Sequence, residues 1–205
     1  VTYVGRLDRG RHLRAFFACL YFAGLRPAEA LDLRLQDCHL PESGWGRLII
    51  SRSKPQANKR WTDTGKAHDD RCLKHRAQGE GRVVPIPPEL VTILREHIDE
   101  FGVHKDGRLF RTRRGEVISI GTYCQAWKAA RVLALTPEQV ASPLAARPYD
   151  LRHAAVSLWL NAGVPAPDVA ERAGHTVDVL LKVYAKCIDG GTEIANQRID
   201  RALIG

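Results

Sequence analysis

Four polar side chains in three separate stretches of this 205-residue chain suit the chemistry of a phosphate group. They are Arg26 in GLRPAEAL, Arg152 in RPYDLRHAAV, and His175 and Tyr184 in AGHTVDVLLKVYAK. A guanidinium clamps two phosphate oxygens with its planar fork. A tyrosine, with an ordinary pKa near 10, needs such a cationic environment before its phenol ionises and attacks phosphorus. The set predicts phosphoryl transfer through an aryl-oxygen nucleophile, for which no metal ion is required.

The first stretch places Arg26 directly before Pro27, a residue that suits the first position of a helix. The unpaired amides at that helix start favour anions, so a phosphate there would be held by both the amides and the guanidinium. Glu29 can pair with an arginine and orient it, or it can simply favour the first helical turn. Taken alone, Arg26 reads more simply as a solvated loop arginine.

The second stretch predicts a helix over about 149–162 with a polar face that is free for a ligand. Tyr149 and Arg152 are three residues apart and project from the same side of this helix. The expected packing stripe on another side consists of Leu151, Ala155 and Leu158. Asp150 favours the helix start, and His153 is open to either a structural hydrogen bond or a chemical role.

The third stretch places His175 on a turn, directly before Thr176, which is a good N-cap for the next helix. A histidine held in this way is rigid and can donate to an anion. Tyr184 falls on the apolar stripe of that helix, so by itself it reads as a core residue. Only the combination with two arginines and a histidine favours a chemical role.

Hydrophobic periodicity and turn residues predict the elements that position these side chains. Helices are expected at 11–23, 27–36, 87–102, 120–133, 149–162, 166–173, 177–187 and 193–203, and strands at 46–53 and 81–87. The segment TPEQVASPLAARP reads as turns. Residues 54–81 carry many charges and little apolar periodicity, which predicts a long polar hairpin insertion.

Composition narrows the class of protein. The net charge of +8 favours a polyanion, foremost nucleic acid, although it also serves solubility. Five cysteines without a CxxC pair predict a reducing, cytoplasmic location, and no apolar run is long enough to cross a membrane. His68, Cys72 and His75 are one ligand short of a zinc site, so neither a metal nor another cofactor is expected.

Together the three stretches resemble the boxes of the tyrosine recombinase family, also called phage integrases. GLRPAEAL is similar to the first arginine box with its supporting acid, YDLRHAAVSLWLNAG to the second, and AGHTVDVLLKVYAK to the closing His and Tyr box. The spacings of 23 residues from Arg152 to His175 and of 9 from His175 to Tyr184 also suit the family. The resemblance implies an α+β, mainly helical catalytic domain with a small antiparallel β-sheet.

The resemblance also implies a lysine on a β-hairpin that protonates the departing 5′ hydroxyl. Lys74, in LKHRAQGEGRVVPIP, is the first choice, with Lys54 and Lys66 as rivals because the hairpin is long. The second box departs from the family at Tyr149, where a histidine is usual. A phenol can bind a phosphate but is a poor proton shuttle near neutral pH.

The implied function is site-specific DNA recombination through a 3′-phosphotyrosine intermediate. Expected partners are double-stranded DNA attachment sites, further copies of the chain in a tetrameric synapse, and an accessory directionality factor. One rival is a type IB topoisomerase, which relaxes DNA with similar residues; another is a non-catalytic DNA-binding module. A metal-dependent nuclease fits poorly because no carboxylate cluster accompanies the arginines.

The expected domain organisation is a catalytic domain over residues 1–205, without the N-terminal DNA-clamping domain that the family implies. The lack of any methionine favours a trimmed chain or a fragment of a longer protein. Residues 191–205, isolated by two glycines, form a C-terminal tail that is expected to dock on a neighbouring subunit.

Overall fold

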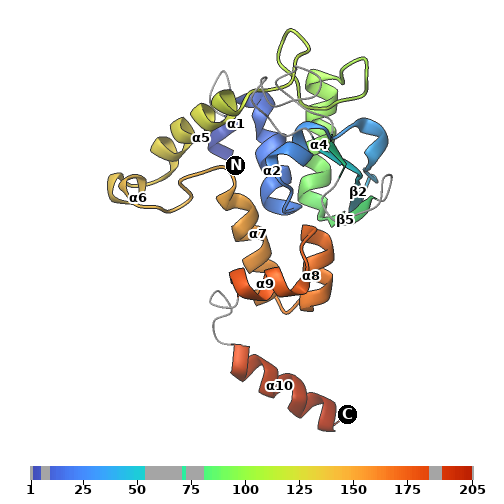
Figure 1. The fold of residues 1–205 in the computed structure, drawn as a ribbon, viewed down its shortest axis with the longest axis vertical. Helices are drawn as coiled ribbons and strands as arrows, with labels where there is room; N and C mark the ends of the chain where they lie inside the picture. Colours follow the sequence, from blue (N-terminus) through green and yellow to red (C-terminus); the bar gives the residue numbers. More distant parts are fainter. Residues whose placement is uncertain (1, 6–9, 54–70, 73–80, 185–190, 205) are drawn as a thin grey trace.

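A computed structural model describes residues 2–5, 10–53, 71–72, 81–184 and 191–204 of the chain (Figure 1). The helices are α1 (Thr2–Gly5), α2 (Arg14–Phe22), α3 (Pro27–Leu31), α4 (Pro88–Phe101), α5 (Ile120–Ala134), α6 (Pro137–Ala141), α7 (Asp150–Asn161), α8 (Ala166–Ala173), α9 (Val177–Tyr184) and α10 (Gly191–Ile204). The 3-10 turns are η1 (Arg11–Leu13) and η2 (Leu35–Asp37), and the strands are β1 (Cys38–His39), β2 (Gly46–Ile50), β3 (Arg52–Ser53), β4 (Arg71–Cys72) and β5 (Arg82–Ile86). The mainly helical α+β class is confirmed.

The sheet is small and antiparallel, as predicted. Its strand order is β1-β2-β5, and Leu48 lies opposite Val84 in the register. Side chains of β2 and β5 alternate between buried and exposed, which places Leu48, Val84 and Ile86 in the core. Strands β3 and β4 form a separate antiparallel pair. They lead toward residues 54–70 and 73–80, which lie outside the described residues. These two ranges include Lys54, Lys66 and Lys74.

The main core forms around α2, which packs against both α4 and α7 (Figure 1). Its centre is aromatic: Phe16 lies 5.8 Å from Phe110 and 5.1 Å from Tyr123, and Phe17 lies 5.1 Å from Trp127, measured between ring centroids. Such contacts add stabilisation to the burial of the rings. The helix is therefore a fixed support for the residues that follow it, beginning with Arg26.

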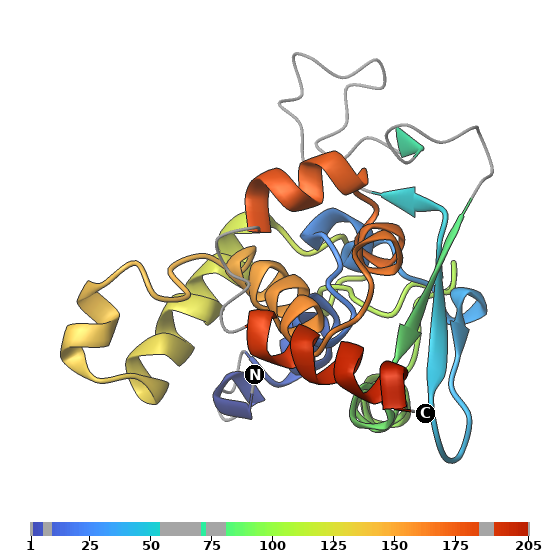
Figure 2. The same cartoon turned by 90° about the horizontal axis from the view of Figure 1, so that it is seen from below.

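A second, smaller core joins α7, α8 and α9. It contains Val156, Val169, Ala170, Ala173, Leu180 and Tyr184. Figure 2 shows α8 between α7 and the sheet, and α8 also contacts β5. The three polar stretches meet where this second core adjoins the first.

The structure departs from the expected elements at 27–36 and in the turn-rich segment that follows α5. The helix expected at 27–36 ends at Leu31, because the backbone beyond it pairs with residues 107–109: Leu35 N donates to Gly107 O at 2.9 Å and Leu109 N to Leu33 O at 3.0 Å. The turn-rich segment TPEQVASPLAARP contains a short helix, α6, that the sequence analysis did not predict. Thr136 caps that helix by accepting from Gln139 N, and Pro137 begins it.

Within the described ranges, no helix is long and apolar enough to cross a membrane.

Candidate active site

Three arginines surround the C-terminal end of α8. Three consecutive carbonyls there each accept a hydrogen bond from a different guanidinium. The pairs are Arg82 Nε with Arg172 O at 3.0 Å, Arg152 Nη2 with Ala173 O, and Arg26 Nη2 with Gly174 O at 2.8 Å. The last carbonyls of a helix lack intrahelical partners and carry the negative end of its dipole, so they attract cations. One short segment therefore gathers guanidinium groups from three distant parts of the chain.

Gly174 makes this arrangement possible because it takes the left-handed conformation, with φ of 62°. Its N–H donates to Glu171 O at 3.0 Å, and His175 N donates to Ala170 O at 2.9 Å. This pair of bonds is the Schellman motif, which ends the helix and satisfies the two preceding carbonyls. The turn leaves the next three carbonyls to the arginines and presents His175 directly beside them.

Arg26 lies at the N-cap of α3, with an extended ψ of 146°, and Pro27 begins the helix as predicted. Glu29 fixes it twice: Arg26 N donates to Glu29 Oε2, and Arg26 Nη1 donates to Glu29 Oε1, both at 2.8 Å. The Arg26 side chain is 35% exposed, in contrast to the buried Arg82 and Arg152. Of these three arginines, Arg26 is therefore the one that solvent reaches.

Glu29 is buried and shared with Arg82, a residue that the sequence analysis did not identify. Arg82 Nη1 and Nη2 donate to the two carboxylate oxygens at 2.8 and 2.7 Å. Burial alone raises the pKa of Glu29, but the hydrogen bonds and charge of Arg82, with the charges of Arg26 and Arg152, lower it to about 2. The carboxylate is ionised. One signal for Arg82 was available, since at period two along β5 it falls on the same inward face as Val84 and Ile86.

Arg152 is fully buried in α7. Its Nη1 donates to Gly24 O, and its Nη2 also lies 2.8 Å from His175 Nε2. Burial, followed by repulsion from Arg26, lowers its pKa to about 10. The expectation of a free polar face on this helix is wrong. The inward face holds Arg152 among Leu151, Ala155 and Val156, whereas Leu158, expected in the packing stripe, is 53% exposed.

His175 is a neutral imidazole. Because a guanidinium only donates, the nitrogen that faces Arg152, Nε2, must accept, which places the proton on Nδ1. Burial and the charges of Arg152, Arg26 and Arg82 lower the pKa of His175 to about 4. Thr176 caps α9 as predicted, accepting from Val179 N at 3.3 Å. The imidazole is therefore held rigidly, with an N–H that can donate.

Tyr184 is buried, with an exposed fraction of 2%, at the C-terminal end of α9. A hydrogen bond of 2.8 Å joins its Oη to His153 Nδ1, and its ring lies 6.3 Å from that of His175 between centroids. Burial, with a further effect of Arg152, lowers the pKa of His153. Tyr149 packs edge-on against the same histidine, 5.1 Å between centroids. Of the two supporting residues in the second stretch, His153 thus contacts the phenol directly and Tyr149 packs against His153.

The structure brings together Arg26, Arg152, His175 and Tyr184, with Glu29, Tyr149 and His153 around them. The lysine of the predicted set cannot be placed, because Lys74 and its rivals Lys54 and Lys66 lie outside the described residues. The same holds for His68 and His75. In the part of the chain that the structure describes, no three His, Cys, Asp or Glu side chains gather closely enough to hold a metal ion.

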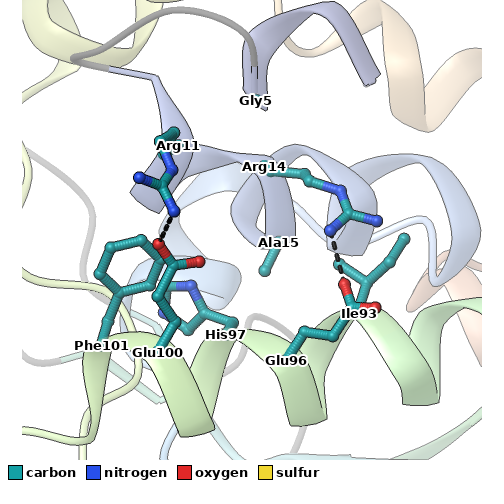
Figure 3. A pocket seen from close by; sticks show the side chains of 9 residues that line it. All are labelled: Gly5, Arg11, Arg14, Ala15, Ile93, Glu96, His97, Glu100 and Phe101. Atoms are coloured by element: carbon teal, nitrogen blue, oxygen red, sulfur yellow. Dashed lines mark hydrogen bonds and ion pairs between the residues drawn. The ribbon is translucent and has the colours of Figure 1, made fainter.

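A separate hollow of about 210 Å³ lies between α2 and α4 (Figure 3). Two ion pairs cross it: Arg11 with Glu100, and Arg14 with Glu96 at 2.6 Å. Figure 3 shows each guanidinium turned toward its carboxylate on α4. This hollow has no part in the site, because its two arginines are already paired with glutamates and none of the predicted site residues lines it.

The fold and the arginine, histidine and tyrosine set define a catalytic domain of the tyrosine recombinase type. The model of the Phage integrase family matches residues 8–189, and the chain belongs to that family.

Individual relatives agree with this assignment. The chain is 22% identical over 193 residues to a tyrosine recombinase XerC-like protein of Caldanaerobacter subterraneus subsp. tengcongensis, covering 88% of this chain and 47% of the relative. The fold is similar to that of the Tn1549 transposon integrase in complex with circular intermediate DNA, with a TM-score of 0.74, 17% identity, and coverage of 97% and 63%. It is also similar to the catalytic domain of bacteriophage HP1 integrase, with a TM-score of 0.55, 18% identity, and coverage of 96% and 86%. The chain therefore spans about half the length of the curated relative.

Proposed function

We propose that this chain is the catalytic domain of a site-specific DNA recombinase, in which Tyr184 is the nucleophile. The observation that carries the proposal is the convergence of Arg26, Arg152, His175 and Tyr184 from three distant stretches. Cationic donors and a phenol in one site suit attack on a phosphodiester, because the donors stabilise the negative charge that develops on the phosphate oxygens.

In the proposed reaction, Tyr184 gives up its phenolic proton to a base, for which His153 Nδ1 lies within 2.8 Å. The phenolic oxygen then forms a bond to phosphorus while the bond from phosphorus to the 5′ oxygen breaks. The products are a 3′-phosphotyrosine and a free 5′ hydroxyl, which takes its proton from a general acid. Lys74 is proposed for that role, with Lys54 and Lys66 as alternatives. A 5′ hydroxyl of the partner duplex then reverses the step, so the phosphodiester energy is conserved and no metal or nucleotide cofactor is required.

The described residues divide the work on the phosphate. Arg26, the exposed guanidinium, is the first that an incoming phosphate meets. His175 Nδ1–H is a second donor, but it is buried and without a hydrogen-bond partner among the described residues, so the site must open before the phosphate can reach it. Arg152 donates to the carbonyls of Gly24 and Ala173. Its buried positive charge lies behind the two groups that would bind the phosphate. His153 supports the phenol through its 2.8 Å bond, which must break as the phenol turns toward phosphorus.

The proposed partners follow from charge and family. An excess of eight positive charges attracts a polyanion, and the proposed substrate is double-stranded DNA with inverted half-sites. Assembly of four copies on DNA, an accessory directionality factor and action in the cytoplasm complete the proposal. Residues 191–205 are proposed to dock on a neighbouring copy, because every side chain described in α10, from 196 to 204, is exposed.

The decisive experiment is trapping of the covalent intermediate on a nicked duplex that loses its short 5′ fragment after cleavage. Wild-type protein is expected to form an adduct that resists denaturation, and Tyr184→Phe is expected to form none, because only the reacting oxygen is removed. Tyr123→Phe, which changes another buried phenol, is the matched control and should react like wild type. The absence of an adduct with wild type, or an adduct with Tyr184→Phe, would contradict the proposed function.

A further inference from the structure

Arg82 is a buried cation with no part in the proposed chemistry, yet it touches two of the segments that form the site. It lies on β5, only 1% exposed, and all three of its guanidinium nitrogens donate. Two of them bind Glu29, and Nε binds the carbonyl of Arg172 at the end of α8. Its guanidinium therefore links β5, through hydrogen bonds, to Glu29 in α3 and to the turn that carries His175.

Glu29 passes this connection on to Arg26. Each carboxylate oxygen accepts from both arginines: Oε1 from their Nη1 atoms, and Oε2 from Arg82 Nη2 and Arg26 N. The four distances are 2.7 to 2.8 Å. Arg26 can therefore keep its orientation only while Glu29 keeps its own, and Arg82 holds Glu29 through both oxygens.

A second connection runs along the backbone. The carbonyl held by Arg82 is followed by those held by Arg152 and Arg26. A shift of Arg82 would therefore move the turn around Gly174, where an added Cβ would already lie 3.1 Å from Arg82 Nη1. The two routes converge on the same group, the guanidinium of Arg26.

We propose that Arg82 is a positioning residue of the strand-cleavage reaction, which acts through Glu29 to hold Arg26 in the orientation that binds the scissile phosphate. This inference rests on the proposed function. A buried ion pair is a weak source of stability, since well-packed apolar residues can replace it at little cost. The rigid, bidentate geometry instead suits the orientation of a neighbouring group, and a lysine cannot reproduce it because it offers one point charge in place of a planar fork.

The test is a double-mutant cycle between Arg82→Lys and Arg26→Lys, measured as the single-turnover rate of adduct formation at saturating DNA. Arg82→Lys alone is expected to lower the rate by about tenfold to a hundredfold, because small misplacements of a binding group have effects of that size. In the Arg26→Lys background the same change should cost less than about threefold, since the two residues then act as one unit.

Arg131→Lys is the matched control. Arg131 is also a buried arginine, and its Nη2 holds backbone carbonyls of residues 139–144 away from the site. The Arg131→Lys variant is expected to have a lower midpoint temperature of thermal unfolding and an unchanged cleavage rate. Each variant is assayed at a temperature well below its own unfolding midpoint, so that a change in cleavage rate does not reflect a loss of folded protein.

Three outcomes are distinguishable. A wild-type protein without a Tyr184-dependent adduct contradicts the proposed function itself. An active wild type with an unchanged Arg82→Lys variant, or with losses that simply multiply in the double variant, overturns only the inference about Arg82. If Arg82→Lys does not fold, Glu29→Gln interrupts the same connection at its middle link and replaces Arg82→Lys in the cycle. An unchanged rate, or losses that multiply in the double variant, would then overturn the inference.

Discussion

The imidazole of His175 is held neutral by its neighbours, because burial and three arginines all disfavour its protonation. A neutral ring suits a hydrogen-bond donor to phosphate better than a proton shuttle, since Nε2 already accepts from Arg152 and only Nδ1 carries a proton. The same shift links the site to folding. The unfolded chain binds a proton at His175 near pH 6.5, whereas the folded chain does so only near pH 4.

This link predicts the pH dependence of stability. The contribution from neutral His175 is complete above about pH 6.5 and is lost as the pH falls toward 4. The free energy of unfolding, measured with urea, should therefore decrease over this range. His175→Gln keeps an acceptor for Arg152 but does not titrate, so its decrease should be shallower. Parallel curves for the two proteins would contradict the assignment, because the other histidines contribute equally to both.

Among single residues, those in local motifs could be predicted from sequence and those defined by tertiary contacts could not. Arg26 precedes a proline, and His175 precedes an N-cap, so both have neighbours that reveal them. Arg82 is one charge in an apolar strand, and its partner Glu29 lies 53 positions away. The burial of Arg152 was also missed, because carbonyls from two other segments satisfy its guanidinium.

At the scale of elements, the C-terminal end of α8 organises the site. The predicted bounds of α8, 166–173, agree with the structure, because Pro167 marks the start of the helix and Gly174 its end in the local sequence. The helix expected at 27–36 is shorter because its C-terminal half pairs with a distant segment, which hydrophobic periodicity does not show. The helix α6 depends on a capped start, which periodicity does not show either. What no local pattern shows is that three arginines converge on the turn that follows α8.

This convergence predicts a large effect of Gly174→Ala. Gly174 and Gly44 both have positive φ, 62° and 84°, and alanine in that region costs roughly 1–2 kcal/mol. At Gly44 an added Cβ meets nothing within 4 Å, whereas at Gly174 it lies 3.1 Å from the Arg82 guanidinium. Gly174→Ala should therefore cost more stability than Gly44→Ala in urea unfolding, and only Gly174→Ala should slow adduct formation. Equal effects of the two variants would show that the arginine contacts are unimportant.

At the scale of the whole molecule, α10 stands apart from the helices around the site (Figure 1). It leaves large apolar side chains uncovered: Ile199, Leu203 and Ile204 are 56, 79 and 87% exposed. Arg198 approaches Gly163 in the turn after α7, close to the second core. Uncovered apolar residues of this kind mark contact surfaces. Under the proposed function, this helix would contact another copy on the same DNA.

Deletion of residues 191–205 tests this arrangement. One copy should still bind a single half-site with unchanged affinity, because Arg26, Arg152 and the second core remain. Assembly of several copies on a full site should be lost, as measured by the mass of the protein–DNA complex. Val132→Ser with Leu133→Ser on α5, which removes two other exposed apolar side chains, should leave assembly intact. If the deleted protein still assembles, the exposed face of α10 has another purpose. If it no longer binds a half-site, the tail supports the domain itself rather than a neighbouring copy.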